Sequence, residues 1–149
     1  MKLLLPAGTK EFGSIAVAGD TLVVGAPSNS TNTGYFLGAA YVFSRKTSGA
    51  WEQMQRLVAS DAESDHFSSD IAFDGDTLLI GASGAAYTND DGSAGAAYVF
   101  TLQAGLWREN QKLTAMDGVT GDKFGYNVAI HGDTLVVGAV GDQEVGIQK

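Results

Sequence analysis

The sequence predicts an all-β protein built from repeated units of four antiparallel strands. The clearest evidence is an eight-residue segment that occurs three times, as GDTLVVGA at 19–26, GDTLLIGA at 75–82 and GDTLVVGA at 132–139. A second repeated segment, GAAYVF, occurs at 38–43 and again at 95–100. No segment shows helical periodicity with capping residues. Self-similarity at a fixed period is the signature of a repeat architecture.

The first strand of each unit alternates large apolar residues with alanine. It reads SIAVAG at 14–19, DIAFDG at 70–75 and NVAIHG at 127–132. This period of two is typical of a strand, and the small residue on one side predicts a crowded position. The second strand, TLVVGA in the first unit, is apolar on both faces and should be buried on both. The two-residue Gly-Asp connections between these strands predict tight hairpins.

The third and fourth strands complete the unit. GAAYVF is the third, and the fourth covers 51–58 and 107–114, where WEQMQRLV and WRENQKLT stand in register. Half of the fourth strand is polar, which places it outermost. Four antiparallel strands graded from buried to polar describe one blade of a β-propeller. We therefore predict strands near 14–19, 21–26, 38–43, 51–58, 70–74, 76–82, 95–101, 107–114, 127–131 and 133–139.

The repeat divides the chain into about two and a half to three blades within a single repeat domain, 1–149. We assign 1–9 to a stray outer strand, 10–61 to blade 1, 62–117 to blade 2 and 118–149 to a partial blade 3. Closed propellers have about four to eight blades. We therefore expect either a fragment of a longer chain or half of an oligomeric propeller, in which two copies supply roughly six blades.

Composition excludes several classes of function. The chain is 44% hydrophobic and 17% charged, with a net charge of −8 and scattered Lys and Arg. An acidic surface without a basic stripe argues against nucleic acid and anionic membranes as partners. The chain has no cysteine, so disulfides and thiolate metal sites are excluded. No apolar run approaches the roughly 20 residues needed to cross a bilayer, and MKLLLPAG is too short for an ordinary signal peptide.

The first unit, EFGSIAVAGDTLVVGAP, resembles an FG-GAP repeat, the propeller blade of integrin alpha-subunit head domains and of many bacterial surface proteins. The resemblance implies a non-enzymatic interaction module for protein–protein or cell-surface binding, with a role in cell adhesion and an extracellular or cell-surface location. The signature is Phe12-Gly13 and Gly25-Ala26-Pro27 in the first unit, Phe67-Ser68 and Gly81-Ala82-Ser83 in the second, and Phe124-Gly125 and Gly138-Ala139-Val140 in the third.

The resemblance also implies calcium, which many such blades hold in a loop between their first two strands. Here that loop is only Gly-Asp, so Asp20, Asp76 and Asp133 are expected to form turns. YTNDDG at 87–92 lacks carboxylates at the first and last positions of a calcium loop. We therefore expect no metal and no cofactor.

No convergent catalytic set is visible. GASGA at 81–85 approaches a nucleophile elbow, but no helix follows and its last residue is Ala85. His66 and His131 occupy different positions in their units. We therefore predict that the protein is not an enzyme.

Long loops on one end of the blades are the predicted binding surface. The second-to-third links and the links between blades share that end. The functional interpretation is a basic or polar partner, and the alternative is that acidic loops only keep the surface soluble. A carbohydrate-binding, lectin-like propeller is the second functional hypothesis, with Tyr35, Phe36 and Tyr87 as stacking platforms. Trp51 and Trp107 could also stack on sugars, but packing against the next blade is favoured. The candidate ligand-binding residues are Tyr35, Phe36, Asp61, Asp65, Tyr87, Asp90, Asp91, Asp117 and Asp122.

Overall fold

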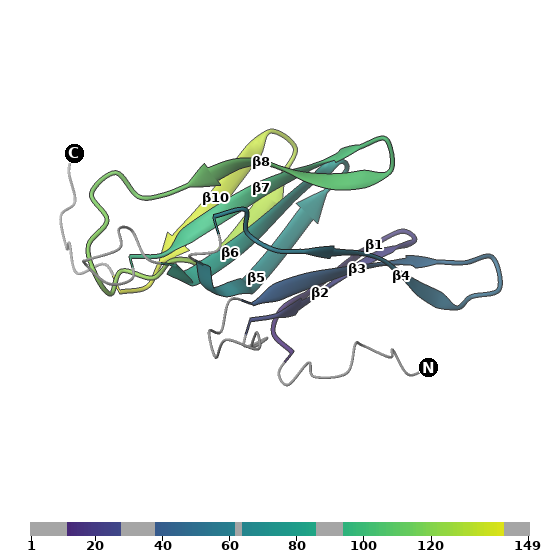
Figure 1. The fold of residues 1–149 in the computed structure, drawn as a ribbon. Helices are drawn as coiled ribbons and strands as arrows, with labels where there is room; N and C mark the ends of the chain where they lie inside the picture. Colours follow the sequence, from purple (N-terminus) through teal and green to yellow (C-terminus); the bar gives the residue numbers. More distant parts are fainter. Residues whose placement is uncertain (1–11, 28–37, 62–63, 86–93, 142–149) are drawn as a thin grey trace.

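The computed structural model is all-β and describes residues 12–27, 38–61, 64–85 and 94–141. Figure 1 shows the strands in two large groups, with a shorter pair of strands beside the second group. No helix in the described part is long and apolar enough to cross a membrane. The ten strands are β1 (Ile15–Ala18), β2 (Thr21–Ala26), β3 (Ala39–Arg45), β4 (Trp51–Leu57), β5 (Ser64–Asp74), β6 (Thr77–Ala85), β7 (Ala96–Gln103), β8 (Leu106–Leu113), β9 (Phe124–His131) and β10 (Thr134–Ala139).

The strands form three antiparallel sheets that follow the predicted repeat. Their orders are β1-β2-β3-β4, β5-β6-β7-β8 and β10-β9. All ten predicted strands are confirmed, and β5 and β9 begin earlier than predicted because each continues past an irregularity in its pairing. We call the three sheets blade 1, blade 2 and blade 3. The predicted outer strand at 1–9 and the tail at 143–149 lie outside the described residues.

Burial follows the predicted grading in the two complete blades. The second strands β2 and β6 are buried, and the fourth strands β4 and β8 alternate toward solvent. The prediction that the second strand is buried on both faces is wrong for β10. In the described part of the chain β10 pairs only with β9, so its outer edge has no third strand beside it.

The core consists of layers between blades. Side chains alternate along each strand, so one face of blade 2 packs on blade 1 and the other on blade 3. Toward blade 1, Phe67 lies against Tyr98 with ring centroids 5.5 Å apart in an edge-to-face contact. Toward blade 3, Leu79 and Val99 pack with Val128. Blade 2 therefore buries both of its apolar faces against its neighbours, and blade 1 has a further buried cluster, which includes Tyr41 and Phe43, on the face turned away from blade 2.

The repeated glycine in the second strand makes room for the next blade. A Cβ atom at Gly25 would lie 2.7 Å from the carbonyl oxygen of Ser68, and one at Gly81 would lie 2.0 Å from that of Gly125. Any side chain there would push the neighbouring first strand away. The Phe-Gly of one unit and the Gly-Ala of the preceding unit are thus the two halves of one junction.

Trp107 packs against the preceding blade, which corrects the predicted direction. It is buried in the layer between blades 1 and 2, and its ring meets Phe73 edge-on at 6.3 Å. The Gln55 side chain of blade 1 accepts from the Trp107 N–H at 2.9 Å and donates to its carbonyl at 2.7 Å. Buried and linked at its backbone, Trp107 is part of the packing and offers no exposed ring to a sugar.

Candidate functional site

The two ends of the blades differ in the links they carry. At one end, Arg45 N–H donates to the Asp20 carbonyl at 2.9 Å, and Leu102 N–H donates to the Asp76 carbonyl at 2.9 Å. These bonds join the end of each third strand, where the third-to-fourth link begins, to the Gly-Asp turn of its own blade. We call this the turn end and the opposite one the loop end. The predicted grouping of the links is therefore correct where the structure describes them.

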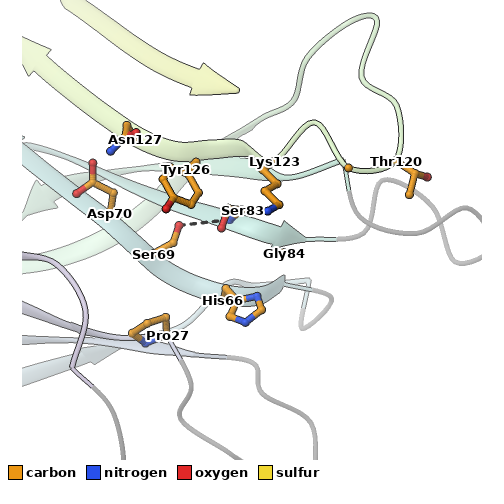
Figure 2. Close-up of a pocket in the computed structure, with 11 residues that line it drawn as sticks. Pro27, His66, Ser69, Asp70, Ser83, Gly84, Thr120, Lys123, Tyr126 and Asn127 are labelled. Atoms are coloured by element: carbon orange, nitrogen blue, oxygen red, sulfur yellow. Dashed lines mark hydrogen bonds between the residues drawn. The ribbon is translucent and has the colours of Figure 1, made fainter. Parts of the chain in front are cut away.

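A pocket of about 740 Å³ opens at the loop end, where the three blades meet. The residue after β2, the first part of β5, the last residues of β6, the segment before β9 and the start of β9 contribute to it. Figure 2 shows Lys123 and Tyr126 on the β9 side, with His66 and Pro27 opposite. The lining residues are Pro27, His66, Ser69, Asp70, Ser83, Gly84, Thr120, Gly121, Lys123, Tyr126 and Asn127.

Ser69 holds the floor of this pocket together. Its hydroxyl donates to the Gly125 carbonyl at 3.1 Å and accepts from the Ser83 N–H at 3.3 Å. These two bonds tie β5 to β6 within blade 2 and to β9 of blade 3. Both hydrogen bonds of the Ser69 hydroxyl are thus made to backbone groups, and they fix the strands that line the pocket.

Asp70 ties all three blades together beside the pocket. One carboxylate oxygen accepts from the Ser14 hydroxyl at 2.8 Å and from its neighbour's N–H, that of Ile71, at 2.9 Å. The other oxygen accepts from the Val128 N–H at 2.8 Å. Because these three donors compensate the negative charge of its carboxylate and hold it in place, Asp70 forms a fixed part of the pocket wall.

The groups that face solvent in the pocket are cationic, aromatic and amide. Tyr126 is 47% exposed, and His66, Lys123 and Asn127 are exposed as well. Such residues on a fixed scaffold suit a polar ligand: the ring provides contact area, and the lysine and the amide provide hydrogen bonds. None of the four is among the predicted site residues: His66 was set aside as a histidine without a catalytic partner, Lys123 ends the link before β9, and Tyr126 and Asn127 belong to a strand, where no binding residue was expected.

The predicted site residues fall into three groups. Tyr35, Phe36, Tyr87, Asp90 and Asp91 lie outside the described residues, and Asp65 lies at the start of β5 with its side chain outside them. Asp117 is exposed at the loop end, after β8. Asp61 and Asp122 already have partners within the chain. Of the nine, the three whose side chains the structure describes, Asp61, Asp117 and Asp122, do not line the pocket, so the ligand-binding assignment of these residues stays a prediction.

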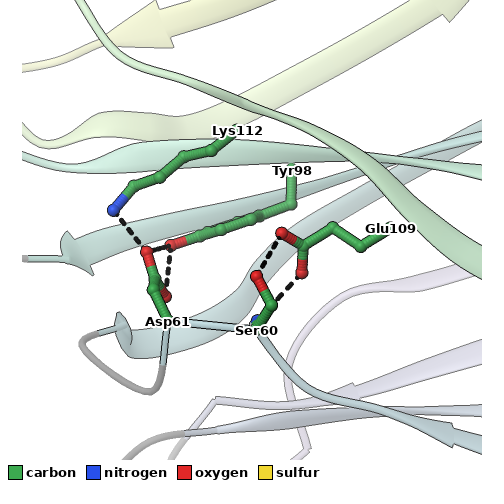
Figure 3. A network of polar contacts seen from close by, with 5 residues as sticks. All are labelled: Ser60, Asp61, Tyr98, Glu109 and Lys112. Carbon is green, nitrogen blue, oxygen red and sulfur yellow. Dashed lines mark hydrogen bonds and ion pairs between the residues drawn. The ribbon is translucent and has the colours of Figure 1, made fainter.

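Asp61 belongs to the junction between blades 1 and 2. Figure 3 shows its carboxylate between Lys112 at 2.5 Å and the Tyr98 hydroxyl at 3.0 Å. Partial burial alone would lower the pKa of Lys112, but the hydrogen bond to Asp61 and the charges of Asp61 and Tyr98 together outweigh it. The pKa of Lys112 is therefore raised above its usual 10.5. Beside this group, the Ser60 hydroxyl donates to Glu109 at 2.7 Å.

Asp122 caps the segment that leads into β9. It is buried, and its carboxylate accepts from the Val119 N–H at 2.7 Å. This is the role of an Asp in a turn. It shapes the rim of the pocket next to Lys123.

Among the described residues, no three His, Asp or Glu side chains gather in a way that could hold a metal ion. Asp20, one of the turn aspartates, pairs with Arg45 at 2.8 Å. The expectation that no metal or cofactor is bound stays a prediction.

Comparison with protein families identifies the repeat. The family model described as FG-GAP repeat matches residues 7–43, 51–100 and 107–149. The chain therefore belongs to the FG-GAP repeat family, whose β-propeller modules are generally interaction-related and non-catalytic. A comparison with curated proteins finds no match to the chain.

Proposed function

We propose that this chain is a non-enzymatic interaction module that binds a protein at a cell surface through its loop end. The observation that carries the proposal is the loop-end pocket, in which exposed Lys123, Tyr126 and His66 surround a floor fixed by Ser69. An aromatic anchor next to hydrogen-bonding groups is typical of a protein-binding surface. The partner reaches it from outside the cell, as the family resemblance implies.

The charge distribution defines the partner more closely. The whole chain carries a net charge of −8, whereas Lys123 and His66 place cationic or ionisable nitrogens in the pocket itself. A polar partner that presents an acidic or amide group to Lys123 and basic groups to the surrounding loops fits both features. Its association weakens as salt is added, because exposed charges are screened.

Carbohydrate is the second candidate ligand. The pocket is lined by hydroxyl and amide side chains beside the exposed ring of Tyr126, and such groups recognise sugars as well. The same experiment distinguishes the two candidates. Purified chain is applied to a glycan array and, in parallel, used to capture protein partners from membranes of the native organism.

The decisive variants lie at opposite ends of the blades. Lys123→Ala with Tyr126→Ala removes both contact groups at the loop end, and we expect at least a tenfold loss of binding to whichever partner is found, about 1.4 kcal/mol. The matched control is Arg45→Ala with Lys46→Ala, a pair of exposed residues at the turn end. If only the control pair lost binding, the site would be at the wrong end, and glycan signal without a protein partner would favour the carbohydrate proposal.

A further inference from the structure

The two junctions within the chain share one arrangement of inner strands. In the first junction, Ala16 and Val23 of blade 1 pack in the layer that contains Ile71 and Phe73 of blade 2. In the second junction, Leu79 of blade 2 packs against Val128 of blade 3. Each blade therefore has two faces. We call the face that packs against the next blade its end face, and the face that packs against the preceding blade its start face.

An inner start face is exposed on blade 1. Phe12, Ile15 and Val17 occupy the positions of Phe67, Ile71 and Phe73, and they are 56%, 61% and 63% exposed. Their counterparts Phe67 and Ile71 are buried. Farther out on the same face of blade 1, Tyr41 and Phe43 are buried already. Leu22, Val24 and Ala26 of β2 are buried as well, so among the described residues the exposed part of this face is limited to Phe12 and β1.

An inner end face is exposed on blade 3. Val136 occupies the position of Val23 and Leu79, which are fully buried, yet it is 58% exposed. Gly138 occupies the position of Gly25 and Gly81. A Cβ atom at Gly138 would meet nothing closer than 3.6 Å, so the space that receives the next first strand is open. Only β9 and β10 form this face in the described part, so it is an inner half-face too.

A polar contact repeats in the same way. The residue before the first large apolar residue of each first strand accepts an N–H of the next blade: Ser14 Oγ from Ile71 N–H at 3.0 Å, and Asp70 from Val128 N–H at 2.8 Å. Asn127 holds this position in blade 3 and is exposed. Its amide oxygen is placed to accept from one more first strand.

We propose that the end face of blade 3 binds the start face of blade 1 in a second copy of this chain. Each copy presents both halves of the junction, with Phe12 and β1 exposed on the start face and β9 and β10 on the end face. Head-to-tail contacts of this kind close into a ring when the rotation per copy allows it. Two copies with three blades each give six, within the roughly four to eight of closed propellers. Ile15 and Val17 then cover Ala129 and Val136, and Gly13 lies over Gly138, as Ser68 lies over Gly25 and Gly125 over Gly81.

The test is the mass of the intact chain in solution, measured by light scattering over a concentration series. We expect the mass of two copies. Val136→Glu, on the end face, and Ile15→Lys, on the start face, should each give the mass of one copy at the same concentrations. Both side chains are exposed in the single chain, so circular dichroism should show an unchanged fold. Met54→Glu, an equally exposed apolar position on the outer strand β4, is the control and should leave the dimer intact.

Mixing the two monomeric variants provides the sharper result. In a mixed ring one contact sets the Val136→Glu face of one copy against the Ile15→Lys face of the other, so that opposite charges meet, and the second contact is unaltered. The mixture should therefore regain the mass of two copies although neither variant does so alone. The proposal is overturned by a wild-type chain that stays monomeric throughout the series. It is also overturned by a dimer that both variants leave intact, by masses that grow beyond two copies, or by a mixture that stays monomeric.

Discussion

The junction between blades 1 and 2 and the junction between blades 2 and 3 use the same elements at different separations. In the second, a Cβ atom at Gly125 would lie 2.0 Å from the Ala96 carbonyl oxygen, so no side chain fits there. In the first, the corresponding residue is Ser68, which is fully buried with a left-handed φ of 73°. Blade 1 therefore leaves space for one hydroxymethyl group that blade 2 does not leave.

The serine replaces glycine without leaving polar groups unpaired. Its hydroxyl accepts from the Ala26 N–H at 3.0 Å and donates to the Ala39 carbonyl at 2.7 Å. Ala26 and Ala39 are cross-strand partners at the ends of β2 and β3. The looser junction is thus stabilised by hydrogen bonds, whereas the tighter one depends on close backbone contact. A departure from the family's Phe-Gly pattern is tolerated where a new polar partner accompanies it.

Gly125→Ala should show the largest effect, because it fills the tight junction. The substitution combines strain at a φ of 87° with the steric conflict with Ala96, and we expect a loss of at least about 3 kcal/mol in the free energy of unfolding. Gly132→Ala is the matched control: its φ is 54°, but nothing lies within 4 Å of the added methyl group. Urea unfolding measures both. Equal losses would mean that backbone strain alone, and not the tight contact, makes Gly125 necessary.

Ser68→Ala tests the looser junction. Removing the hydroxyl leaves the Ala26 N–H and the Ala39 carbonyl buried without this partner, which costs about 1–3 kcal/mol. Ser68→Gly loses the same bonds but relieves the left-handed strain, so it should cost less than the alanine variant. Ser48→Ala removes a long, exposed contact in a turn and should change stability little. A Ser68→Ala chain as stable as wild type would show that the hydroxyl does not hold the two blades together.

The difference between the junctions also shows what the sequence could and could not predict. Threefold periodicity located every strand, because alternation and turn residues are local properties. The Gly-Ala and Phe-Gly signatures were visible, but their partnership across blades was not, since it depends on which residues approach one another after packing. At Gly25 and Gly81 glycine makes room for the next blade, and the sequence of one strand alone does not reveal that requirement.

The candidate site was harder to predict for the same reason. The grouping of the links at the two ends was predicted correctly where the structure describes them, whereas binding at the loop end stays a prediction. Lys123 and Tyr126 carry no motif, and they become a site only because blade 3 sets β9 beside Ser69 and His66. Asp61 looked like a surface carboxylate of the loop end, but Tyr98 and Lys112 of the next blade surround it.

Alkaline pH should destabilise the junction between blades 1 and 2, and this is the smallest of the effects on stability that we predict. Because the pKa of Lys112 is raised in the folded chain, the stability it contributes is fully present below pH 10.5 and is lost as pH rises through the folded value. Both side chains of the Lys112–Asp61 pair remain partly exposed, so screening limits the loss to below about 1 kcal/mol. Lys112→Met should remove this part of the pH dependence when urea unfolding is compared on both sides of pH 10.5. Asp117→Asn is the control. Asp117 follows the fourth strand of blade 2 as Asp61 follows that of blade 1, but it is exposed, and the structure describes no outer strands of blade 3 beside it. A Lys112→Met chain with the same alkaline loss as wild type would assign that loss to other groups.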